Sequence, residues 1–279
     1  MQYVYCRIRY GDSLREYRDR VVIVSESLGG YWTVIKNVCS LSLLFNAGAY
    51  CWYLSVSRIP MGDLTAIYNS SCFFTYIFSV LVLREALSAK KLLAVLMSVG
   101  GIAVISLLSH PNDVDPLTDS SPASTLFGYF SALLSALWVA SYEVAFTKHL
   151  VPPTRPSPLF SLHVTGLVGV ASAILGTIPF PLLHLTQWEP FELPPAQALA
   201  GIAVTAALGL AFNAVFMLLI SFGGPVVAAV GVMLTIPLTV GVDFFVTGSP
   251  IRWAAVVGTV LILAGFGMLT WEQAEERRR

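Results

Sequence analysis

Residues 230–248 read VGVMLTIPLTVGVDFFVTG, a stretch that is apolar apart from Asp243 and a few small hydroxyl side chains. Stretches of this kind recur along the chain, which has 279 residues, 56% of them hydrophobic and 11% charged. A soluble domain of this size cannot bury so much apolar surface, because surface-to-volume scaling limits its core. The composition therefore indicates a membrane protein.

The apolar residues gather into eight blocks. Each block is close to the roughly 20 residues that cross about 30 Å of hydrocarbon as a helix. A transmembrane β-barrel would instead show alternating segments of about ten residues, which this sequence lacks. We predict an all-α fold, a polytopic membrane helix bundle with eight spans at approximately 38–56, 64–83, 92–108, 125–147, 158–185, 196–222, 225–246 and 251–270.

Lys and Arg are distributed unevenly when the loops are assigned alternately to the two sides of the membrane. One side holds fourteen of the sixteen basic residues, and the other holds only Arg58 and Arg252. Loops rich in Lys and Arg face the cytosol. Both termini are therefore predicted to be cytosolic, with tails at 1–36 and 272–279.

Residues that hold cofactors or perform catalysis show no recognisable spacing. The four His residues fall outside HExxH and Cys/His patterns, and the four Cys residues lie in the predicted cytosolic tail or inside spans. The GxGD and GxSG motifs of membrane-embedded proteases are also missing from the sequence. We expect no metal, no cofactor and no nucleic-acid partner, and an enzyme is the less favoured class.

Two parts of the chain repeat the same order of elements: a long span, a tight turn, a second long span and a span containing Gly. The strings FNAGAYCWYLSV and FNAVFMLLISF lie before the two tight turns. Aligning Thr75 with Thr239 places Gly101 opposite Gly265 at the same offset of 164 residues. Self-similarity of this kind indicates an internal duplication.

The linker SHPNDVDPLTDSS at 109–121 separates the two copies. It lacks Lys and Arg and carries several Asp residues, so we expect it on the non-cytosolic side. The predicted domains are an incomplete first repeat of three helices at 37–108 and a second repeat of five helices at 122–271.

Three stretches resemble the drug/metabolite transporter superfamily, and above all solute carrier family 35, subfamily F. They are DLTAIYNSSCFFTYIFSVLVLREALSAKKLLAVLMSVGGI at 63–102, ALWVASYEVAFTKHL at 136–150 and GVMLTIPLTVGVDFF at 231–245. The resemblance extends from about residue 31 to 272. It implies two five-helix EamA-type repeats of opposite orientation, so the first two of ten helices are expected to be missing here. It also implies transport of a small polar organic solute, and some members of subfamily F are associated with thiamine.

Glu143 and Asp243 are the two carboxylates clearly inside spans, where a charged side chain usually faces a cavity or a partner. An alternative of equal weight is that Glu143 snorkels to the interface, since Lys148 marks the cytosolic end of its helix. For Asp243 the equal alternative is a structural ion pair with Arg252 across a short turn. As a cavity-lining group, either carboxylate would bind a proton or a cationic substrate.

Trp138 and Tyr142 are four residues apart, so they share one stripe of a helix, and Glu143 follows directly. Aromatic rings beside an acid suit an organic cation such as a thiazolium, although each ring taken singly is more often an ordinary core or lipid contact. Asn69 has three polar neighbours in YNSSC, which favours a position facing the cavity. The candidate substrate-binding residues are Glu143, Asp243, Asn69, Trp138 and Tyr142.

Pro237 is the candidate helix kink. Kinked helices are where transporters expose backbone to substrate, and a tolerated kink without a ligand is an equal alternative. We expect a secondary transporter working by alternating access in the Golgi, the vacuole or the plasma membrane. Its partners would be a small-molecule substrate and the lipid bilayer, with a homodimer left open. The alternative function is a non-transporting or truncated structural membrane protein.

Overall fold

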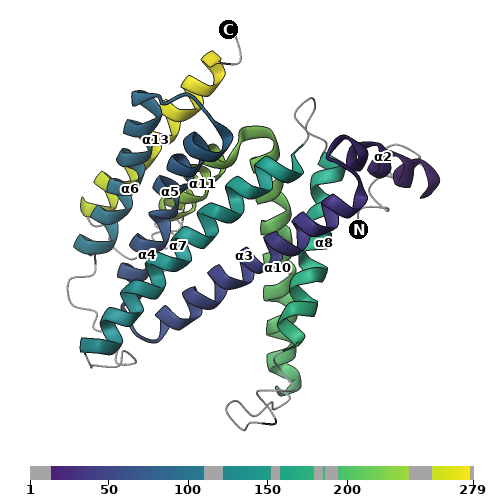
Figure 1. Ribbon diagram of the computed structural model, residues 1–279. Helices are drawn as coiled ribbons and strands as arrows, with labels where there is room; N and C mark the ends of the chain where they lie inside the picture. Colours follow the sequence, from purple (N-terminus) through teal and green to yellow (C-terminus); the bar gives the residue numbers. More distant parts are fainter. Residues whose placement is uncertain are drawn as a thin grey trace. The chain divides into compact units, whose positions relative to one another are not determined.

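The computed structural model describes residues 14–109, 122–151, 158–178, 185, 194–238 and 253–276. Every regular element in these ranges is a helix, so the predicted all-α membrane bundle is confirmed (Figure 1). By length and composition, five of the described helices are able to cross a membrane, and Pro225–Leu238 forms a shorter apolar helix. The five are Asp63–Leu83, Pro122–Leu150, Phe160–Thr177, Ala198–Gly223 and Trp253–Glu272.

Each of the eight predicted apolar blocks contains a helix. In chain order the helices are α3 (Tyr31–Val56), α4 (Met61–Asn69), α5 (Ser71–Phe78), the π-helix η1 (Ser79–Leu83), α6 (Ala89–Ser109), α7 (Pro122–Leu150), α8 (Pro158–Thr177), α10 (Ala196–Gly223), α11 (Pro225–Met233) and α13 (Trp253–Glu276). The second predicted span thus consists of three consecutive helical pieces.

The segment predicted as an N-terminal tail contains regular structure. Helix α2 covers Leu14–Ser27, and α3 already begins at Tyr31. Val21 and Ser25 of α2 are buried, so this charged helix is packed although it lacks a long apolar run. At the other end, α13 continues to Glu276 and so covers the first five residues of the predicted C-terminal tail.

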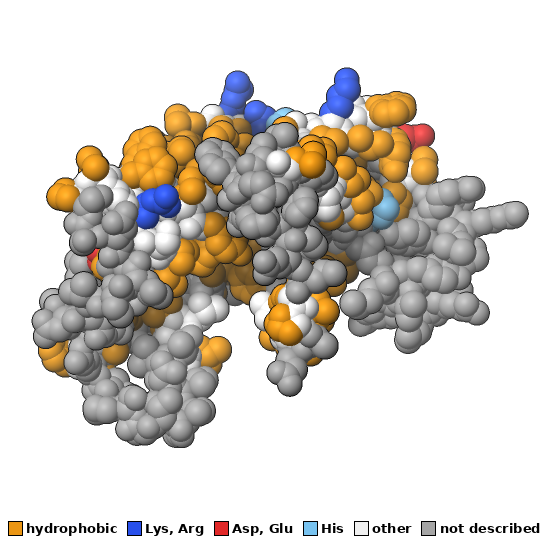
Figure 2. All heavy atoms as spheres, turned by 90° about the horizontal axis from the view of Figure 1, so that it is seen from below, with side chains coloured by type: hydrophobic (Ala, Val, Ile, Leu, Met, Phe, Trp, Pro, Cys, Tyr) orange, Lys and Arg blue, Asp and Glu red, His pale blue; other side chains and the backbone are white. Residues whose placement is uncertain are grey.

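Large apolar side chains are exposed on much of the surface. On α10, for example, Ile202, Val204 and Leu208 are each more than half exposed. Figure 2 shows hydrophobic side chains covering much of the described surface on one face. An apolar surface of this extent is costly in water and ordinary in lipid, which agrees with a multi-pass membrane protein.

The chain divides into two compact units. Unit 1 comprises Met1–Asn46 and Ala145–Phe222, and unit 2 comprises Ala47–Val144 and Gly223–Arg279. Both units combine segments from before and after the 109–121 linker. The units therefore do not coincide with the predicted repeats, whose boundaries stay a prediction.

Polar side chains join helices within unit 1. The Asn46 amide on α3 donates to Ser172 Oγ on α8 at 3.0 Å. The hydroxyls of Ser161 on α8 and Ser221 on α10 lie 2.7 Å apart. Hydrogen bonds of this kind stabilise the association of helices in a bilayer. The hydrophobic effect does not drive this association, because the lipid tails are as apolar as the helix surfaces.

Glycines make a close helix contact in unit 2, where α6 lies beside α13 (Figure 1). A Cβ at Gly101 would lie 2.6 Å from the backbone oxygen of Gly258, and a Cβ at Gly258 would overlap the backbone oxygen of Gly101. A Cβ at Gly265 would lie 2.6 Å from Ala94 O and would overlap Ser98 Oγ. The two backbones thus meet where a side chain would not fit.

The helix bounds of unit 2 repeat with a shift of 164 residues. The nine-residue helices α4 and α11 begin at Met61 and Pro225, and α6 and α13 begin at Ala89 and Trp253. This shift is the offset at which the sequence aligned Thr75 with Thr239.

The backbone breaks and the glycine contacts follow the same shift. Ser70, which ends α4, has φ −63° and ψ −12°, and Leu234, which ends α11, has φ −64° and ψ −17°. Gly101 meets Gly258, and its counterpart Gly265 meets Ala94, the counterpart of Gly258. Two equivalent segments that pack on each other around a two-fold axis show this reciprocity.

Candidate substrate site around Glu143

Glu143 is a carboxylate of α7 that is buried in unit 2. Its side chain is 3% exposed, and Oε2 accepts a hydrogen bond from Thr75 Oγ1 on α5 at 2.8 Å. Thr75 is fully buried as well. The carboxylate therefore faces α5, which differs from the snorkelling alternative, in which it would extend toward the helix end at Lys148.

One stripe of α4 and α5 lies toward Glu143. Tyr68, Cys72 and Thr75 follow one another at intervals of four and three residues, so they share a face of a helix. Tyr68, Cys72 and Tyr142 all interact electrostatically with Glu143. Tyr68, Cys72 and Thr75 were not predicted as site residues, although their helical spacing within an otherwise apolar span was a usable signal.

The break between α4 and α5 falls in the middle of this stripe, at Ser70. The Ser70 hydroxyl donates to Ile67 O at 2.5 Å, and the Ser70 N–H donates to the same oxygen at 3.0 Å. The Phe73 N–H then donates to Ser70 O at 2.9 Å. These three-residue intervals are 3₁₀ geometry, and a serine hydroxyl that competes for a helix carbonyl commonly bends the helix.

A second departure from α-helical geometry follows α5. Residues Ser79–Leu83 form the π-helix η1, and Arg84 after it adopts the left-handed conformation with φ 59°. The Ser79 side chain is fully buried, and its hydroxyl has no hydrogen-bond partner within the described ranges. Single π-helical turns occur often at functional sites. Helix α5 is thus an eight-residue segment between two irregular turns.

The predicted site residues occupy different surroundings. Tyr142 is 5% exposed and interacts with Glu143. Trp138 packs against α3, where a Cβ at Gly48 would lie 3.3 Å from the Trp138 Cβ. The Asn69 amide donates to a carbonyl one turn earlier in α4 at 2.7 Å. The observed contacts therefore unite Tyr142 with Glu143, while Trp138 and Asn69 engage other groups.

Pro237 is described, whereas Asp243 and Arg252 lie outside the described residues. Helix α11 ends at Met233, and the Leu234 N–H donates to a carbonyl three residues earlier at 3.2 Å. Pro237 has no N–H to donate to Met233 O, which accounts for an interruption at this point. The predicted Asp243–Arg252 pair stays a prediction.

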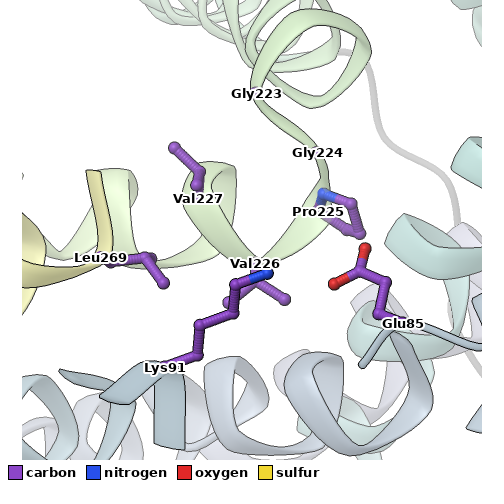
Figure 3. Close-up of a pocket in the computed structure, with 8 residues that line it drawn as sticks. All are labelled: Glu85, Lys91, Gly223, Gly224, Pro225, Val226, Val227 and Leu269. Carbon is purple, nitrogen blue, oxygen red and sulfur yellow. The ribbon is translucent and has the colours of Figure 1, made fainter. Parts of the chain in front are cut away.

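A small hollow lies at the turn between α10 and α11. Figure 3 shows the Lys91 side chain extending toward Val226 and the Glu85 carboxylate directed toward Pro225. Its volume is about 120 Å³, whereas pockets for organic ligands usually measure about 300–1,000 Å³. The hollow is therefore too small for an organic solute. Its lining consists of Glu85, Lys91, Gly223, Gly224, Pro225, Val226, Val227 and Leu269.

Comparisons with known proteins point to one class, the multi-pass membrane proteins of the transporter type. A model of the EamA-like transporter family matches residues 24–107. An uncharacterized transporter of Schizosaccharomyces pombe is 28% identical over 232 residues, which are 83% of this chain and 67% of that protein. Solute carrier family 35 member F5 of Bos taurus is 23% identical over 244 residues, which are 84% of this chain and 44% of that protein.

The chain is similar to the EamA-like transporter family over residues 24–107 and has relatives in solute carrier family 35, subfamily F. A solved crystal structure aligns with a TM-score of 0.58 over 89% of this chain and 91% of that chain. Its identity is 16%, so this likeness concerns the fold alone. The chain spans 67% of the length of the first relative and 44% of the second. A shared activity with these relatives is therefore a proposal. The family and these names point to transport rather than catalysis.

Proposed function

We propose that the protein is a secondary transporter that carries a small polar organic solute by alternating access, with Glu143 as the charged centre of its substrate site. The observation that carries this proposal is the Glu143 carboxylate, buried between α7 and α5 and held by Thr75 at 2.8 Å. A carboxylate at membrane depth is costly, and such residues mark substrate and ion pathways in transporters.

The substrate class that fits best is an organic cation, for example one resembling thiamine. Tyr68 and Tyr142 both lie near the Glu143 charge. An aromatic face attracts a cation by its quadrupole, and the carboxylate supplies the opposite charge. A bound cation would also replace the solvation that the carboxylate loses inside the bundle.

Asp243 is retained as a second candidate of this site. At the shift of 164 residues it corresponds to Ser79, which is fully buried. This correspondence supports a position inside the bundle for Asp243 in preference to one facing lipid.

The proposal includes inverted repeats at 37–108 and 122–271 and a cytosolic location of both termini. The repeated helix bounds and the reciprocal glycine contacts support the repeats. The fourteen-to-two distribution of basic residues supports the orientation. Epitope tags at both ends, stained after selective permeabilisation, test it: staining of either tag in intact cells or organelles would contradict a cytosolic location.

The experiment for the site is uptake by liposomes that contain the purified protein. We expect accumulation of radiolabelled thiamine, and we expect Glu143→Gln to insert normally and to lower uptake about tenfold or more, as loss of a charged hydrogen bond of about 1.5–3 kcal/mol predicts. Asp63→Asn is the matched control, because Asp63 is a half-buried carboxylate of α4 that accepts a hydrogen bond from Tyr129 on α7 at 2.5 Å. Uptake by Glu143→Gln equal to wild type would refute the site.

A solute panel separates the substrate class from the function. Uptake of neutral or anionic solutes without uptake of cations would contradict the proposed cationic substrate. It would still support the proposal that the protein is a transporter. Absence of flux for every solute would favour the structural membrane protein instead.

A further inference from the structure

Two neighbouring residues of α5 make polar contacts with different partners. Thr75 donates to Glu143 on α7. The Tyr76 hydroxyl donates to Ser88 O at 3.0 Å and accepts from the Ser88 N–H at 3.2 Å. Ser88 directly precedes α6. Helix α5 therefore connects the candidate site with the start of α6.

Ser88 is held from a third direction by α13. The Ser88 hydroxyl donates to the Glu272 carboxylate and accepts the Lys91 N–H at 3.4 Å, so it caps the first turn of α6. Tyr76, Ser88 and Glu272 thus form a clasp that joins α5, α6 and α13. This clasp lies on the pair of helices that also meet at Gly101 and Gly258 (Figure 1).

Two buried side-chain oxygens lack a hydrogen-bond partner within the described ranges, one in the clasp and one on the segment that follows Tyr76. They are Ser79 Oγ, one turn after Tyr76, and Glu272 Oε2, the second oxygen of the clasp carboxylate. A buried polar atom without a partner is unfavourable. Both atoms would gain from a different arrangement of the segment between the irregular turns at Ser70 and Ser79.

We propose that α5 is a relay that couples the charge of Glu143 to the clasp of Tyr76, Ser88 and Glu272. A hydrogen bond to a carboxylate is roughly twice as strong as one to a neutral acceptor. When a cationic substrate neutralises Glu143, the Thr75 bond weakens and α5 turns about its two irregular ends. Because Tyr76 follows Thr75, this movement shifts the Ser88 contact and loosens the first turn of α6. The coupling to a substrate rests on the proposed function.

Glu143→Gln mimics the neutralised site in the full-length protein without any substrate. We expect the backbone amides of residues 88–94 to exchange hydrogen for deuterium about fivefold faster in this variant, as loss of about one hydrogen bond predicts. In a Tyr76→Phe background, exchange is already fast, and Glu143→Gln should add nothing. Asp63→Asn is the matched control, because its bond to Tyr129 involves α4 and not α5, and it should leave exchange at 88–94 unchanged.

Substitution of Thr75 keeps the test decisive if Glu143→Gln fails to fold. Thr75→Val should accelerate exchange at 88–94, and Thr75→Ser should preserve the wild-type rate. Unchanged exchange in Glu143→Gln and Thr75→Val, or effects of Glu143→Gln and Tyr76→Phe that simply add, would overturn the relay. The exchange experiment uses no solute, so a negative exchange result does not bear on the transport proposal. In the same way, a negative uptake result does not bear on the proposed relay.

Discussion

Helices α4 and α11 begin 164 residues apart, have nine residues each and end in turns of the same conformation, yet their side chains differ. Tyr68 of α4 corresponds to Val232 of α11, and Cys72 beyond the break corresponds to Ile236. Tyr68 and Cys72 therefore have apolar counterparts, whereas Thr75, which donates to Glu143, corresponds to Thr239. The shared backbone geometry does not depend on the polar chemistry that only one copy carries.

The two breaks also have different causes. In α4 the Ser70 hydroxyl donates a hydrogen bond to the main-chain carbonyl of Ile67. After α11, Pro237 lacks the N–H that would donate to a carbonyl one turn earlier. An interruption that occurs at both positions with two different chemistries indicates that the interruption itself is needed. In transporters, interrupted helices lie where substrate meets backbone.

The largest expected effect concerns the contact between α6 and α13, two helices that begin 164 residues apart. Gly258→Ala should lower the melting temperature of the purified protein by several degrees, because overpacking costs roughly 1–3 kcal/mol and the obstructing Gly101 O is a backbone atom. Gly267→Ala in the same helix is the control, since nothing lies within 4 Å of its Cβ position. Equal melting temperatures for both variants would show that α6 and α13 are not in close contact.

The next effect tests whether the polar stripe is specific to the first copy. Tyr68→Val introduces the counterpart residue and should weaken cation uptake about tenfold in apparent affinity, since a cation–π contact contributes up to about 2 kcal/mol. Tyr68→Phe keeps the ring and should stay near wild type. If Tyr68→Val transports cations with unchanged affinity, the stripe is not part of the substrate site.

The helices were predictable because a bilayer demands long apolar segments, and each predicted block contains a helix within the described residues. Helix α2 was missed because Leu14–Ser27 is charged and its burial depends on packing rather than on an apolar run. The three-piece second span was missed for a related reason. Periodicity reveals that a segment is helical, but it does not reveal a local hydrogen bond such as that from the Ser70 hydroxyl to Ile67 O.

Glu143 was predictable as a candidate site residue because a carboxylate inside a span is rare. Its partner Thr75 was not predicted, because the face of α5 that meets α7 is decided by tertiary packing. The same limit explains Trp138: it shares a stripe with Tyr142, but Gly48 gives α3 a close approach to it. Local spacing therefore identified the charge and not the contacts around it.

A smaller effect is expected where proline causes the break. Pro237→Ala supplies an N–H and should slow amide exchange at 234–238 about fivefold, a gain of about 1 kcal/mol out of the roughly 3 kcal/mol that an interior proline costs a helix. Pro225→Ala is the matched control, because Pro225 occupies the first turn of α11, where proline is tolerated. Unchanged exchange in Pro237→Ala would mean that tertiary packing, and not proline, ends α11 at Met233.

The smallest effect is expected at Ser70, the break between α4 and α5. Ser70→Ala removes the hydroxyl bond to Ile67 O and substitutes a better helix former, so amides at 70–74 should exchange about two- to threefold more slowly as α4 and α5 join. Ser70→Thr retains a hydroxyl and should keep the wild-type rate. Leu234→Ala, at the equivalent position, should also change little, because Pro237 still interrupts that helix. Should Ser70→Ala leave exchange unchanged, the serine is not the cause of the break. Packing around α4 and α11 would then impose the interruption on both helices.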